Sequence, residues 1–171
     1  MTALARLTEP RIAAALILLG AGATIGAALA FEHLGGYRPC PLCLWQRWPY
    51  YVGLPVAFGL FLWGPNRPGA GLGFAALCAI FLVSAGLGAY HSGVEWGWFL
   101  GPSDCAAAAR PAAPAGMADF LRQLETTRVV SCTEAAWRFL GVSMAGWNAL
   151  ISAGIAGLAA LALVKPRSWP A

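Results

Sequence analysis

The chain has 171 residues, of which 59% are hydrophobic and only 11% are charged. Soluble domains carry about 25% charged residues, so this composition predicts an integral membrane protein that forms a single domain over residues 1–171. The formal net charge of +4 is small and is not concentrated in one patch, which argues against a nucleic-acid partner.

Four apolar stretches are each long enough to cross a bilayer, which takes about 20 helical residues. They cover residues 12–31, 44–63, 72–90 and 144–164. Glycine and alanine are abundant in these stretches, and small residues let membrane helices pack closely. The fold class that we predict is therefore all-α, a bundle of four transmembrane helices.

Basic residues in the short flanks of these stretches predict the orientation. Five of the eleven lie in three short segments on one side of the membrane, namely Arg6, Arg11, Arg67, Lys165 and Arg167, while six of the seven acids lie on the other. We expect both termini in the cytoplasm of a bacterium and a multi-pass protein of its inner membrane. The connections 32–43 and 91–143 would then lie in the periplasm.

The N-terminus also has some features of a cleaved signal peptide, because a basic start and an apolar run precede "ALA" at 28–30. The apolar run is longer than signal peptides use, so we expect it to be retained as the first helix. Either alternative leaves Cys40 and Cys43 on the exported side.

The long connection contains a segment with a helical pattern of its own. After the linker "ARPAAPAG" at 109–116, the residues Met117, Phe120, Leu121 and Leu124 recur with the spacing of one helix face. We predict a short amphipathic helix here, which either lies on the membrane surface or packs on top of the bundle.

Five cysteines occupy positions 40, 43, 78, 105 and 132. Exported cysteines tend to be oxidised, so two disulfides that merely stabilise the loops are one interpretation, with Cys78 left as a small apolar residue. A zinc site would need two further ligands at short spacing. Cys105 and Cys132 are too far apart for that, and neither histidine has a typical spacing, so we predict no metal.

The surroundings of Cys43 favour redox chemistry over a structural disulfide. A bridge between Cys40 and Cys43 closes a very small loop and stabilises little. Cys43 also lies near the start of a predicted helix, where Pro41 suits the first turn and the helix dipole favours an anion. Arg47 follows on the same helix face. We therefore predict a reactive thiolate at Cys43, although Arg47 could instead simply extend to the lipid headgroups.

This dithiol lies at the depth where the headgroup of a membrane quinone would lie, and the sequence has no haem, flavin or nucleotide motif. His91, at the outer end of the third predicted helix, reaches the same level. It is either an interfacial residue or a group that binds a quinone carbonyl.

Three stretches resemble the DsbB family of quinone-linked, disulfide-generating membrane proteins. They are "CPLCLWQRWPYY" at 40–51, "AYHSGVEWGWFLGPSDC" at 89–105 and "SCTEAAWRFLGVSMAGWN" at 131–148. With the four predicted spans, the resemblance covers nearly the whole chain.

The resemblance implies an electron relay whose catalytic residues are Cys40, Cys43, Cys105 and Cys132. Cys105 and Cys132 would accept electrons from a DsbA-like periplasmic oxidase with a thioredoxin fold, with Cys105 forming the mixed disulfide. Cys132 would then exchange with Cys40. Cys43 would react with ubiquinone or menaquinone, which Arg47 and His91 would bind. Within 92–100 the family motif does not fix which residue helps to hold the quinone, and Glu95 and Trp96 are the candidates there.

Two alternatives remain open at this point. A quinone reductase related to vitamin K epoxide reductase would carry its Cys-x-x-Cys on a late helix, whereas here the motif precedes the second. A non-catalytic membrane scaffold with structural disulfides would need no quinone.

Overall fold

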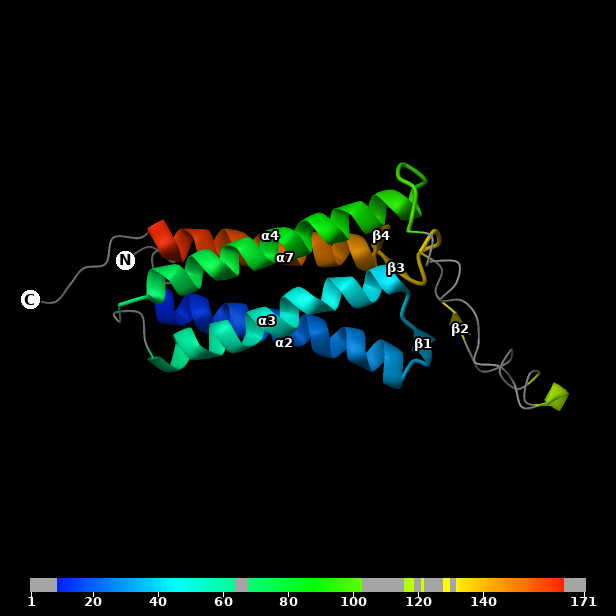
Figure 1. The fold of residues 1–171 in the computed structure, drawn as a ribbon, viewed down its shortest axis with the longest axis horizontal. Coiled ribbons are helices and arrows are strands. Elements are labelled where there is room, and N and C mark those ends of the chain that lie inside the picture. The colour runs from blue at the N-terminus through cyan, green and yellow to red at the C-terminus, as the bar shows by residue number, and fades with distance from the viewer. Residues whose placement is uncertain are drawn as a thin grey trace, which may run out of the picture.

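Four long helices lie side by side in the computed structural model, which describes residues 9–63, 68–102, 116–118, 121, 128–129 and 132–164 (Figure 1). They are α2 (Pro10–His33), α3 (Pro41–Trp63), α4 (Ala70–Glu95) and α7 (Met144–Val164). The end of α2, the start of α3, the end of α4 and the start of α7 meet at one end of the bundle, which we call the cysteine end.

Each predicted span corresponds to one of these helices. Helices α3 and α4 extend beyond their predicted bounds at the cysteine end, and this changes where Cys43 and His91 lie. Helix α3 begins at Pro41, so Cys43 lies within its first turn. Helix α4 continues to Glu95, so His91 lies inside the last turns and is buried.

Three of the four helices, α2, α4 and α7, are long and apolar enough to cross a membrane. Helix α3 has a similar length of 23 residues but carries Gln46, Arg47 and two internal prolines, Pro49 and Pro55. These residues lower the hydropathy of α3. The two polar ones, Gln46 and Arg47, lie near the cysteine end.

The core of the bundle is built from small side chains. Alanines 13, 14, 21, 57 and 159 are fully buried, and only a few larger residues such as Ile17 and Phe81 fill the remaining space. Large apolar side chains point outward instead, for example Leu19, Phe58 and Val83. This arrangement suits lipid surroundings, where helices gain from close packing and outward apolar surface is not penalised.

Helices α4 and α7 lie close together at Gly88. A Cβ at this position would lie 2.8 Å from the backbone nitrogen of Ala149 and 2.9 Å from the carbonyl oxygen of Ala145. Glycine is therefore required there for the two backbones to meet, and this contact brings His91 and Asn148 into neighbouring turns.

Two very small sheets lie at the cysteine end (Figure 1). Strand β1 (Tyr37–Arg38) pairs in parallel with β2 (Arg128–Val129), and β3 (Arg138–Phe139) pairs antiparallel with β4 (Val142–Ser143). The first sheet attaches the long connection to the segment just before Cys40. The predicted amphipathic helix around 117–124 falls almost wholly outside the described residues.

Candidate functional site

Cys40 is the N-cap residue of α3. Its carbonyl oxygen accepts the first helical hydrogen bond from the backbone N–H of Leu44, and its Sγ accepts one from the backbone N–H of Cys43 at 3.2 Å. The Cys43 Sγ lies 2.8 Å from the Cys40 Sγ, and both cysteines are free. The two thiols of the motif are thus in contact at the positive end of a helix dipole.

This geometry stabilises an anion on Cys40. The hydrogen bond from the Cys43 thiol is the largest influence and, with help from His91, lowers the pKa of Cys40 to about 5 even though burial opposes the change. The sequence predicts the thiolate at Cys43. In the reduced pair described here, Cys40 is the sulfur that receives the hydrogen bonds, because it occupies the N-cap.

A chain of hydrogen bonds runs from the cysteine pair into the bundle, and we call it the polar chain. His91 Nε2 lies 3.8 Å from Cys40 Sγ, and His91 Nδ1 lies 2.6 Å from Gln46 Nε2. From Gln46 the chain continues through Asn148 and Tyr50 to Ser152 and Ser84. The residues come from α3, α4 and α7, so the chain ties three helices together.

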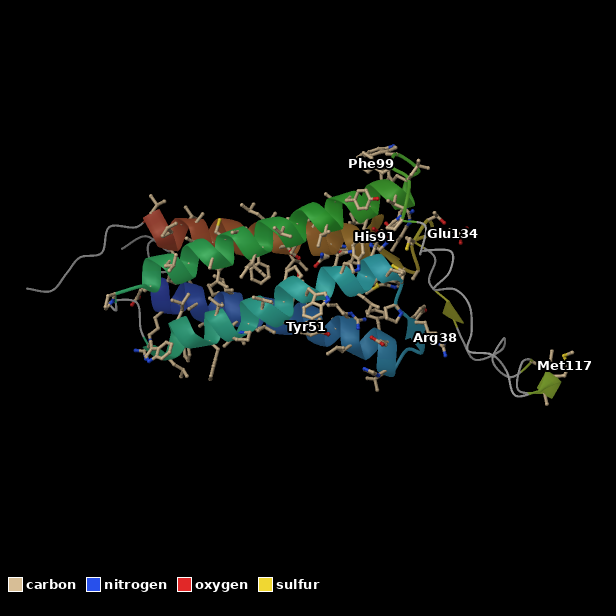
Figure 2. All side chains as sticks on the ribbon, in the orientation of Figure 1. Arg38, Tyr51, His91, Phe99, Met117 and Glu134 are labelled. Atoms are coloured by element: carbon tan, nitrogen blue, oxygen red, sulfur yellow. The ribbon has the colours of Figure 1, made fainter. Side chains whose placement is uncertain are left out.

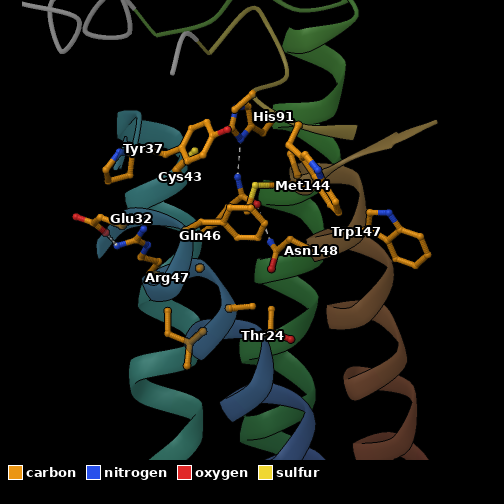
Figure 3. Close-up of a pocket in the computed structure, with 18 of the residues that line it drawn as sticks. Thr24, Glu32, Tyr37, Cys43, Gln46, Arg47, His91, Met144, Trp147 and Asn148 are labelled. Atoms are coloured by element: carbon orange, nitrogen blue, oxygen red, sulfur yellow. Dashed lines mark hydrogen bonds and ion pairs between the residues drawn. The ribbon is translucent and has the colours of Figure 1, made fainter. Parts of the chain in front are cut away.

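The direction of these bonds determines the tautomer of His91. Tyr50 donates to Asn148 Oδ1 at 2.5 Å. Asn148 Nδ2 in turn donates to Gln46 Oε1 at 2.7 Å (Figure 3). Gln46 therefore presents its NH₂ group to His91 Nδ1, which must accept. In the neutral ring the proton then lies on Nε2, where it faces the Cys40 sulfur.

A cavity of about 430 Å³ opens beside the cysteine pair, between α2, α3 and α7. Its walls are mostly apolar, with Ile25, Ala28, Phe31, Trp137 and Ile151 among them. The Cys43 side chain lines the cavity together with a small set of polar groups, which includes Gln46, Arg47, His91 and Asn148 (Figure 3). Cavities of this size, apolar with a few directed polar groups, are typical of small-molecule sites.

Arg47 lies one turn below Cys43 and pairs with a carboxylate. Its Nη1 donates to Glu32 Oε2 on α2, and the two side chains are only 11% and 28% exposed. Arg47 is therefore held against the cavity wall by an ion pair rather than extended away from the bundle.

Glu95 also lines the cavity, from the last turn of α4. Its side chain is only 5% exposed, and its Oε1 lies 4.0 Å from His91 Nε2, which is too long for a hydrogen bond. Its Oε2 is buried and has no hydrogen-bond partner among the described residues. A buried carboxyl oxygen in that state is rare in proteins.

The second cysteine pair is described only in part. Cys132 is in a disulfide, is fully buried, and packs in one cluster with Cys40, Leu42 and Val94. The pairing of β1 with β2 agrees with this position, because Arg128 and Val129 lie beside Tyr37 and Arg38. Cys132 comes three positions after Val129, and Cys40 comes two positions after Arg38. Cys105 lies outside the described residues. Cys78 is free and half-buried. It lies in the first half of α4, away from the cysteine end, where it packs against the apolar core.

Cys40, Cys43 and His91 also form a cluster that could hold a metal ion, with their ligand atoms within 4.8 Å of one another. The spacing of these residues in the sequence gives no sign of this, because His91 comes from another helix. A structural zinc site has four protein ligands, so the cluster found among the described residues is one ligand short.

The family of the chain follows from comparison with known proteins. The family model described as disulfide bond formation protein DsbB matches residues 10–162. The chain belongs to the DsbB family. Membership makes it a membrane protein of disulfide bond formation.

Individual DsbB relatives match over nearly their full length. Disulfide bond formation protein B of Marinobacter nauticus is 29% identical over 90% of this chain and 94% of its own. The proteins of the same name from Stutzerimonas stutzeri and Dechloromonas aromatica are 31% and 32% identical, over 92% and 86% of this chain and 95% and 88% of their own. No solved structure matches the chain at a significant level.

Of the predicted site residues of this DsbB-family chain, the structure brings together Cys40, Cys43, Arg47, His91 and Cys132. Sequence reasoning missed Glu32, Tyr50 and the roles of Gln46 and Asn148. The signal for the last two was present, since an amide inside a membrane-spanning stretch is costly and marks a functional or packing contact.

Proposed function

We propose that the protein reoxidises a DsbA-like periplasmic dithiol oxidase and passes the electrons through its two cysteine pairs to membrane quinone. The observation that carries this proposal is the position of Cys43. One member of a contacting thiol pair lines an apolar cavity, while the other packs against a disulfide-bonded cysteine from the long connection.

The burial of Cys132 supports the order of the steps. A protein partner has no access to a sulfur that is fully buried, so it must attack the other cysteine of that disulfide, which we assign as Cys105. Cys132 would then be released next to Cys40. Each step is an attack by a thiolate on a disulfide sulfur, which requires this kind of proximity.

The lining of the cavity suits a quinone ring. Apolar walls would bind its faces and its isoprenoid start, and the carbonyl oxygens need a small number of hydrogen-bond donors. Arg47 and the second N–H of the Asn148 amide are donors on that lining. The quinone supplies the two-electron acceptor, and Cys43 is the sulfur positioned to deliver electrons to it.

The same proposal includes the topology. Helix α3 would be the fourth span, with both termini in the cytoplasm and the cysteine end at the periplasmic face of the inner membrane. Its length and its position among α2, α4 and α7 support this (Figure 1).

The test is a quinone assay with the purified protein in lipid. Reduced DsbA-like partner and a short-chain ubiquinone are added, and quinone loss is followed by absorbance while partner oxidation is followed by thiol trapping. We expect one quinone reduced for each partner disulfide formed. Absence of turnover would contradict the proposal and would favour the alternative, a non-catalytic membrane scaffold with structural disulfides.

Two variants separate the halves of the relay. Cys105→Ala should abolish reaction with the partner but leave quinone reduction by the chemically reduced protein, whereas Cys43→Ala should abolish quinone reduction. Cys78→Ala is the matched control and should change neither. If Cys43→Ala and Cys105→Ala only destabilise the protein, without separable redox defects, the interpretation as a non-catalytic scaffold is correct.

A further inference from the structure

Quinone reduction consumes protons as well as electrons, and the structure contains a carboxyl group placed to supply them. We propose that Glu95 is a catalytic residue that transfers a proton from the cysteine pair to a quinone oxygen. The inference rests on the proposed function and adds a residue and a step to it.

The first argument is the state of the Glu95 side chain. It is 5% exposed and lines the cavity, yet its Oε2 has no hydrogen-bond partner among the described residues. Burying a carboxyl without a partner is unfavourable. A ligand oxygen in the cavity would provide the missing hydrogen bond.

The second argument is that His91 is not free to act as the base. Its Nδ1 accepts from Gln46 at 2.6 Å, and Gln46 is held in that orientation by Asn148. The proton on Nε2 faces Cys40 Sγ at 3.8 Å and Glu95 Oε1 at 4.0 Å. His91 therefore stabilises an anion on either neighbour but has no lone pair left for a proton.

The third argument is that the other carboxylate at the cavity is already committed. Glu32 accepts from Arg47 in a short ion pair. Among the described carboxylates that line the cavity, Glu95 is therefore the one with a buried oxygen that lacks a hydrogen-bond partner.

The step balances as follows. In the reduced pair Cys40 is the thiolate and Cys43 the thiol. The S–H bond of Cys43 breaks, an S–S bond forms between the two sulfurs, and two electrons pass from the Cys43 sulfur to the quinone. Two O–H bonds form on the quinone, which leaves as quinol. Glu95 takes up the proton that Cys40 releases when it ionises on the other side of the same imidazole N–H, and gives that proton to a quinone oxygen. Its carboxylate regains a proton in the same way when the cysteine pair is next reduced. The second proton comes from the Cys43 thiol, which itself lines the cavity.

The test is a single-turnover measurement with the full-length protein in lipid. The protein is first reduced, then mixed without oxygen with a short-chain ubiquinone, and quinone loss is followed by absorbance. Glu95→Gln keeps the size of the side chain but cannot carry a proton, and we expect its rate at saturating quinone to fall about 100-fold. Glu134→Gln, which removes an exposed carboxylate at the same end of the bundle, is the matched control and should keep the wild-type rate (Figure 2).

A second variant guards against a purely structural explanation. Glu95→Ala should be equally slow and should recover at least 10-fold in rate when formate is added, because a small acid can replace a missing proton carrier. A structural role would not respond to formate.

Three outcomes would overturn the inference. Glu95→Gln could keep the wild-type rate, it could lose rate only below saturating quinone, or Glu95→Ala could show no response to formate. In each case wild type would still reduce quinone and Cys43→Ala would not, so the proposed function would stand. If wild type itself fails to reduce quinone, the proposed function fails instead.

Discussion

The two ends of the helix bundle are built on different principles. Toward the end opposite the cysteines, alanine and glycine allow the helices to pack closely, and the buried residues are almost all apolar. Toward the cysteine end, the interior contains an ion pair, the polar chain, a cavity and an unpartnered carboxyl. The first end can be expected to provide stability, and the second provides chemistry at some expense of stability.

The largest expected effect concerns the close packing of helices at the end opposite the cysteines. Ala159 is fully buried in the core cluster, so Ala159→Leu should overfill it and lower the free energy of unfolding by about 3 kcal/mol. Thermal unfolding in detergent measures the change, and the quinone reduction rate per folded molecule should be unaltered. Ala153→Leu, on the exposed face of the same helix, is the control. Equal stability of the two variants would contradict the packing argument.

The next effect tests the cysteine end. Arg47→Ala removes a charged donor from the cavity and should weaken quinone binding by roughly 30-fold, about 2 kcal/mol, with little change in folding. Titration of the tryptophan fluorescence with a short-chain ubiquinone measures the affinity. Arg138→Ala removes an exposed arginine nearby and should bind quinone normally. Unchanged affinity in Arg47→Ala would mean that Arg47 serves only its ion pair with Glu32.

A smaller effect concerns pH. The pKa of Cys40 is lowered to about 5 in the folded protein, from an ordinary value of 9.0. Because the folded state favours the thiolate, this stabilisation is full above the ordinary pKa and is lost as pH falls toward about 5. The reduced protein should therefore lose about 1.3 kcal/mol of stability between about pH 7 and about pH 6.

Thermal unfolding of the reduced protein across this pH range measures the slope. Cys40→Ala should abolish it, and Cys43→Ala should flatten it, because the Cys43 thiol is the main donor to Cys40. A slope that is identical in wild type and Cys40→Ala would show that another group is responsible.

The smallest effect concerns the orientation of His91. Gln46→Leu removes the donor to Nδ1, so His91 should sample both tautomers, and quinone reduction should slow about 3-fold, or about 0.6 kcal/mol. Ring ¹⁵N NMR of histidine-labelled protein reports the tautomer directly. A single Nε2–H tautomer in the variant would show that Gln46 does not set it. Gln46→Asn, which keeps an amide, tests whether the donor alone restores the orientation.

The two ends also differ in how far the sequence predicts them. The four helices follow from the apolar stretches, because length and composition are local properties. Cys40 as the N-cap could have been inferred as well, since Pro41 is suited to the first position of a helix. The sequence prediction of a thiolate at Cys43 did not take the N-cap position of Cys40 into account.

The contacts between helices could not be predicted. The bonds of Gln46 to His91 and Asn148, and of Arg47 to Glu32, join positions from 15 to 102 residues apart. They depend on the rotation and depth of each helix, which are set by close contacts such as the one at Gly88. No local pattern in a single sequence records those two quantities.

The sheet formed by β1 and β2 consists of only two residue pairs. So short a pairing is only marginally stable in isolation, and Cys132 follows β2 by three positions in the sequence. The covalent tether nevertheless keeps Cys132 at an effective concentration in roughly the millimolar range beside Cys40. In the proposed relay, a dithiol partner in solution at micromolar levels would therefore compete poorly for Cys40, and exchange within the chain would be favoured over direct reaction of Cys40 with the partner.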